Sequence, residues 1–62
     1  MSAEDRLARA EELLDQLEGA RAKLEETDDP EVAIDIAAQL SELAKAVQAE
    51  LELAKREADA QP

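Results

Sequence analysis

The residues of this chain that could do chemistry are mostly carboxylates, and one group of them is concentrated in a short segment. It comprises Glu25, Glu26, Asp28, Asp29 and Glu31. Hard cations such as Ca²⁺ prefer oxygen ligands, so a metal site is the first chemistry to weigh. A calcium loop of the EF-hand type needs alternating acids, a central Gly and a Glu at its twelfth position, and this segment lacks that pattern. We interpret the cluster as a solvated turn and expect no metal.

Catalytic side chains are scarce. The chain contains no Cys and no His, so it lacks a thiolate nucleophile and the usual proton shuttle at neutral pH. The hydroxyl groups that could act as nucleophiles belong to Ser2, Thr27 and Ser41, and none has a His to activate it. Catalysis by carboxylates alone needs paired acids in a cleft, and we interpret Glu50 and Glu57 as residues at the edge of a helical seam. The sequence therefore predicts a protein that is not an enzyme and that uses no cofactor.

The charge balance bears on partners and location. The 62 residues include 7 Lys and Arg against 17 Asp and Glu, which gives a formal charge of −10, and no residue is aromatic. Affinity for nucleic acid comes largely from basic side chains, so we expect no direct nucleic-acid partner and no acidic membrane partner. No apolar run reaches the roughly 20 residues that cross a bilayer, and the first residues are acidic where a signal peptide would be basic. These features predict a cytoplasmic protein.

The elements that position these groups are helices. Ala, Leu, Glu, Lys, Arg and Gln dominate the sequence, and all of them favour helix. Ser2 followed by Asp5 resembles a capping box, while Asp29 before Pro30 predicts a second helix start. We expect one all-α domain over residues 1–62, a helical hairpin with a helix at about 3–26, a turn at 27–29 and a helix at about 30–59.

Apolar residues follow a coiled-coil heptad pattern along both helices, with alternating steps of three and four residues. In the first helix the predicted seam passes through Leu7, Leu14, Arg21 and Leu24, where the stem of Arg21 covers apolar neighbours. In the second helix a shift of spacing near Val47 predicts a stutter. The predicted core and interface residues are Leu7, Leu13, Leu14, Leu17, Leu24, Ile36, Leu40, Leu43, Val47 and Leu51.

The apolar content is small for a monomer. Only thirteen residues are Leu, Ile or Val, and chains of this size without disulfides or metal commonly rely on oligomerisation. More apolar residues flank the seam than one pair of helices needs, including Leu13, Ile34 and Leu53. The sequence thus predicts a homodimer that forms a four-helix bundle and serves as a structural, assembly or adaptor module.

Part of the chain resembles a known family. The residues that carry the resemblance are Leu24, Glu25, Asp28, Pro30, Leu43, Ala44, Lys45, Gln48, Ala49, Leu51 and Ala54. They are similar to the small subunit of exodeoxyribonuclease VII over about half of the chain, although the aromatic residue usual in the second helix of that family is absent. The resemblance implies a helical hairpin that binds a larger protein subunit as a non-catalytic accessory.

The length and hairpin layout also resemble the Rop family of dimeric four-helix bundles. That resemblance implies an architecture only, because RNA binding in that family implies basic and aromatic side chains, whereas the first helix here is acidic. Two further readings stay open: a designed bundle, and an acidic mimic of nucleic acid that occupies a basic groove.

Overall fold

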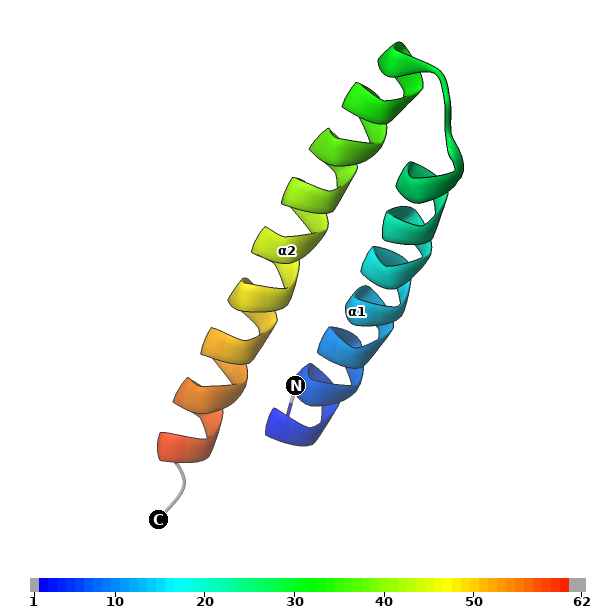
Figure 1. The fold of residues 1–62 in the computed structure, drawn as a ribbon. Helices are drawn as coiled ribbons and strands as arrows, with labels where there is room; N and C mark the ends of the chain where they lie inside the picture. Colours follow the sequence, from blue (N-terminus) through cyan, green and yellow to red (C-terminus); the bar gives the residue numbers. More distant parts are fainter. Residues whose placement is uncertain (1, 61–62) are drawn as a thin grey trace.

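The computed structural model describes residues 2–60, which form an antiparallel hairpin of two helices (Figure 1). Helix α1 spans Ala3–Glu26 and helix α2 spans Pro30–Asp59. The start of α1 and the end of α2 lie at the same end, and the hairpin is 52 Å long. The predicted all-α hairpin is therefore confirmed, and both helices occupy the predicted ranges.

Side-chain caps define where the helices begin. The Ser2 hydroxyl accepts a hydrogen bond from the Asp5 N–H at 3.2 Å, and the Asp5 carboxylate accepts one from the Ser2 N–H at 3.4 Å. This reciprocal pair satisfies two donors that a helix N-terminus leaves free. At α2 the Asp29 carboxylate accepts from the Glu31 N–H at 2.9 Å, and Pro30 occupies the first helical position.

The seam of α1 differs from the one predicted. The residues of α1 that are not exposed to solvent are Ala3, Arg6, Ala10, Leu13, Leu17, Ala20 and Leu24. They keep an unbroken three-four spacing, so Arg6 and Leu13 occupy the places predicted for Leu7 and Leu14. Leu7 and Leu14 are 46% and 44% exposed, and Arg21 is exposed as well.

The seam of α2 also corrects the prediction. It consists of Ala33, Ile36, Leu40, Leu43, Val47, Glu50, Ala54 and Glu57, and the half-buried Ala46 and Leu53 lie directly beside it. The heptad spacing continues past Val47 through Glu50, so the predicted stutter is absent, and Leu51 is 45% exposed. The physical reason is that two glutamates occupy seam positions, where they pair with a cation from α1.

The core between the helices is thin and rich in alanine. Its buried residues are Ala10, Leu13, Ala20, Ile36, Val47 and Ala54. Half of these are Ala, whose small side chain lets two helices approach closely. The predicted seam residues Leu17, Leu24, Leu40 and Leu43 are only partly buried. The hairpin thus shields few large side chains from water.

Candidate functional site

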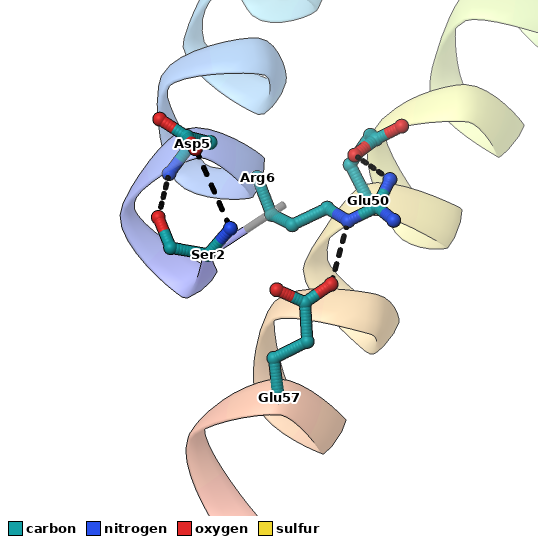
Figure 2. Close-up of polar contacts among 5 residues, drawn as sticks. All are labelled: Ser2, Asp5, Arg6, Glu50 and Glu57. Atoms are coloured by element: carbon teal, nitrogen blue, oxygen red, sulfur yellow. Dashed lines mark hydrogen bonds and ion pairs between the residues drawn. The ribbon is translucent and has the colours of Figure 1, made fainter. Parts of the chain in front are cut away.

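An ion-pair layer closes the open end of the seam. Arg6 of α1 reaches across to α2, where its Nε donates to Glu57 Oε1 at 2.8 Å and its Nη1 donates to Glu50 Oε2 at 3.3 Å (Figure 2). Exposed fractions of the three side chains are 22%, 26% and 19% in the order Arg6, Glu57 and Glu50. Charge-assisted bonds of this kind keep charged groups in a half-buried position.

One carboxylate oxygen of the ion-pair layer lacks a hydrogen-bond partner. Glu57 Oε2 is shielded from solvent and has no hydrogen-bond partner. The hydrogen bond to Glu57 is the main cause that raises the pKa of Arg6 above its ordinary value. A raised pKa stabilises the fold at every pH below the ordinary arginine value, and the contribution is lost only above it. Arg6 therefore stays charged wherever the protein would be studied.

The layer acts as a structural device. Polar residues at seam positions of coiled coils select register and partner at some cost in stability. We expect one cation between two carboxylates to favour the observed alignment of the helices, because a slip along the seam would leave at least one of the two glutamates without Arg6. The heptad pattern predicts Arg21 as the arginine of the seam, and Glu50 and Glu57 as edge residues. In the structure Arg6 is the arginine of the seam, and both glutamates lie in the seam with it. The signal that could have found the layer is the i, i+7 repeat of Glu50 and Glu57.

A second feature is an apolar strip that the hairpin leaves uncovered. Leu7, Leu14 and Leu51 are all between 44% and 46% exposed, and each directly follows a seam residue. One residue along a helix turns the side chain by about 100°, so these leucines lie on the flank of the seam. In antiparallel helices the residues that follow corresponding seam positions share one side of the pair. We call this strip the leucine face; its members are Leu7, Leu14, Ala37, Ala44, Leu51 and Ala58, and the exposed Arg21 occupies the same heptad position near the turn.

Two rims border the leucine face, and their charge differs. Both rims follow the heptad spacing and contain only exposed residues. The α1 rim consists of Glu4, Glu11, Glu18 and Glu25. The α2 rim consists of Ile34, Ser41, Gln48 and Lys55. Three ion pairs are recorded among the described residues, and neither Glu4 nor Lys55 takes part in them. One edge of the face is thus uniformly acidic, whereas the other has no carboxylate.

The opposite flank of the seam is more polar. On α1 it carries Arg9, Gln16 and Lys23, and Arg9 pairs with Glu12 at 3.3 Å. A hollow of about 280 Å³ lies there, lined by Gln16, Gly19, Ala20, Lys23 and Gln39. We call this side the polar flank. Its α1 residues offer hydrogen-bonding groups to water, whereas its α2 residues are Val32, Gln39, Ala46 and Leu53, of which Ala46 and Leu53 are half-buried beside the seam.

The acidic cluster at the turn is spread over exposed positions. Glu25, Glu26, Asp28, Asp29 and Glu31 are all exposed. Within residues 2–60, no three side chains of the metal-binding types come together as a possible metal site. Neither of the described helices is both long enough and apolar enough to cross a membrane. The carboxylate of Asp29 serves as the α2 cap.

Within the described residues, the leucine face and the ion-pair layer are therefore the two features that ordinary solvation of a helix surface does not explain. Comparison of the chain with protein-family models, curated proteins and solved structures found no match.

Proposed function

We propose that this chain is a non-catalytic helical hairpin that pairs with a second copy through its leucine face and works as a cytoplasmic assembly or adaptor module. The observation that carries the proposal is the exposure of Leu7, Leu14 and Leu51 on one side of the seam. Contiguous apolar surface of this kind marks an interaction site in small soluble proteins. A chain without cysteine is suited to a reducing compartment.

The thin core supports the same proposal. Packing of α1 against α2 buries six residues, three of which are Ala, and a hairpin of this size rarely supplies enough apolar burial to fold alone. A second hairpin laid on the leucine face would shield the three exposed leucines and the half-buried leucines of the seam. The result is a four-helix bundle, which is the arrangement that gives every helix two neighbours.

Sedimentation equilibrium, with circular dichroism on the same samples, tests the proposal. We expect a helical dimer at micromolar concentration for the native chain. Leu14→Asp places a charge on the leucine face and is expected to shift the chain to monomer. Val32→Asp is the matched control, because Val32 is 42% exposed but lies on the other side of the seam. Equal dimerisation of both variants would contradict the proposal.

The second candidate is an accessory subunit that covers its leucine face with a larger, different protein. The observation that favours it is the same thin core, which a larger partner could complete. A native chain that stays monomeric and weakly helical across the concentration series would select this candidate. The next experiment would then be a pull-down in which Leu14→Asp loses, and Val32→Asp keeps, one specific bound protein.

A further inference from the structure

We infer that the two hairpins of the dimer pack with α1 of one copy against α2 of the other, so that both turns lie at the same end of the bundle. The inference rests on the proposed function, because it assumes that a second copy covers the leucine face. It adds the direction of packing, which decides which surfaces the assembled bundle presents. The charges on the two rims of the face distinguish the possible directions.

Two symmetric arrangements bring two leucine faces together. A two-fold axis along the helices places α1 over the partner's α2 and puts both turns at one end. A two-fold axis across the helices instead places α1 over the partner's α1, α2 over the partner's α2, and the turns at opposite ends. Both bury the same leucines, so hydrophobic contact does not distinguish them. The rims do, because different rims meet in the two cases.

The crosswise arrangement brings like charges together. It would align the α1 rim of one copy with the α1 rim of the other along the whole contact, and each rim contributes the four glutamates Glu4, Glu11, Glu18 and Glu25. Like charges that face each other across a helix contact are a common means by which coiled coils reject a partner. Arg21 is the one basic residue beside that rim, three residues after Glu18 and four before Glu25, so it offsets only part of the repulsion.

The lengthwise arrangement matches the rims. Arg6 contacts both Glu50 and Glu57, so it lies level with a point between them. Glu4 stands two residues earlier in α1 and therefore lies level with Lys55 of the antiparallel helix. Since an axis along the helices keeps both α2 helices at one height, Glu4 of each copy faces Lys55 of the other. This places an ion pair at each of two symmetric sites.

The same alignment provides partners further along the rim. Glu11 comes level with Gln48 of the other copy, and Glu18 comes level with Ser41. Both Gln and Ser can donate a hydrogen bond to a carboxylate. Glu25 comes level with Ile34, which is 68% exposed in the single hairpin and would be covered by the methylenes of the glutamate.

The lengthwise arrangement also brings two acidic turns to one end. The carboxylates of that cluster are all exposed, and exposed charges separated by more than about 8–10 Å are largely screened at ordinary salt. The rim carboxylates, in contrast, border the contact along its whole length. Rim complementarity therefore outweighs repulsion between the turns.

A distance measurement between the turns distinguishes the arrangements. The chain has no cysteine, so Asp28→Cys carries a single spin label for pulsed dipolar spectroscopy. We expect a label-to-label distance on the order of 20 Å, because packed helices lie about 8–10 Å apart. A distance close to the 52 Å length of the hairpin in a chain that sediments as a dimer would overturn this inference and keep the proposed function. Absence of any dimer would overturn both.

A charge swap tests the rim contact by a separate route. Lys55→Glu should weaken dimerisation about three- to tenfold through its two symmetric sites, and the double variant Glu4→Lys with Lys55→Glu should restore it. Lys45→Glu is the matched control, because Lys45 is exposed and lies outside the seam, the leucine face and its rims. Failure of the double variant to bind more tightly than Lys55→Glu would contradict the predicted pairing.

Discussion

The leucine face and the polar flank border the same seam at the same helical spacing, yet they differ in the large side chains that they expose. One flank exposes Leu7, Leu14 and Leu51, whereas the other carries Arg9, Gln16 and Lys23 on α1. The packing of α1 against α2 runs through the seam, with the half-buried Ala46 and Leu53 of the polar flank beside it. The exposed leucines are therefore the apolar residues that the single hairpin leaves available to bind another chain.

The largest effect is expected from introducing a charge at each of two neighbouring leucines, one in the seam and one on the leucine face. Leu13 is 5% exposed in the seam, whereas Leu14 is 44% exposed on the leucine face. Leu13→Asp buries an unpaired charge and is expected to cost about 3 kcal/mol or more, enough to unfold so small a chain. Circular dichroism should show loss of helix for Leu13→Asp.

Leu14→Asp is the matched variant at the next position. It is expected to keep more helix than Leu13→Asp in the same buffer at matched, high protein concentration, and its main defect should be in association. Equal loss of helix in the two variants would show that folding and association share one core, so that the flanks are not separate from the seam.

A second test concerns the ion-pair layer. Arg6→Leu leaves Glu50 and Glu57 half-buried without a cation, so thermal melts should show a lower midpoint than the native chain. Replacing all three residues with Leu removes the unpaired carboxylates and should restore or raise the midpoint, because apolar residues of similar volume often replace buried ion pairs without loss. The triple variant should also lose specificity, which sedimentation would detect as a mixture of oligomers.

If the triple variant melted below Arg6→Leu, the layer would contribute stability rather than alignment. The native chain and Arg6→Lys provide the controls. Lys keeps the charge but lacks the planar fork that contacts two carboxylates together, so its midpoint should lie between those of the native chain and Arg6→Leu.

The ends of the helices could be predicted from the sequence because they depend on neighbouring residues. Ser2 with Asp5, and Asp29 with Pro30, are local signals whose geometry follows from side chains three or fewer positions away. The fold class follows from the same signals together with one break in an otherwise helical composition. The helix ends and the fold class could both be predicted because they depend on interactions between residues close together in the sequence.

The seam could not be chosen in the same way. Leu13 and Leu14 are adjacent and equally apolar, so two heptad stripes differing by one residue compete in α1. The choice depends on contacts across the hairpin: Arg6 finds Glu50 and Glu57 in one stripe, and Arg21 remains exposed. Each stripe contains one arginine, so charge alone does not distinguish them; the distinction comes from pairing between residues more than forty positions apart.

The third test concerns the α2 cap, which lies outside both flanks. Asp29→Ala removes the acceptor for the Glu31 N–H and is expected to lower the free energy of unfolding by about 1 kcal/mol. Asp28→Ala is the control, because Asp28 is exposed and makes no hydrogen bond among those recorded for the described residues. Urea denaturation of both variants would measure the difference, and equal midpoints would contradict a capping role for Asp29.

The smallest expected effect is at Gly19, on the polar-flank side of α1. Beyond the adjoining helix backbone and the two neighbouring residues, a methyl group added there would meet no atom within 4 Å, and Gly inside a helix costs about 0.5–1 kcal/mol relative to Ala. Gly19→Ala should therefore stabilise the chain by that amount in urea denaturation without changing its dimerisation. A Gly19→Ala variant that folded more stably but dimerised less would place the second copy on the polar flank, because a methyl group that meets open space in one hairpin can obstruct only a neighbour.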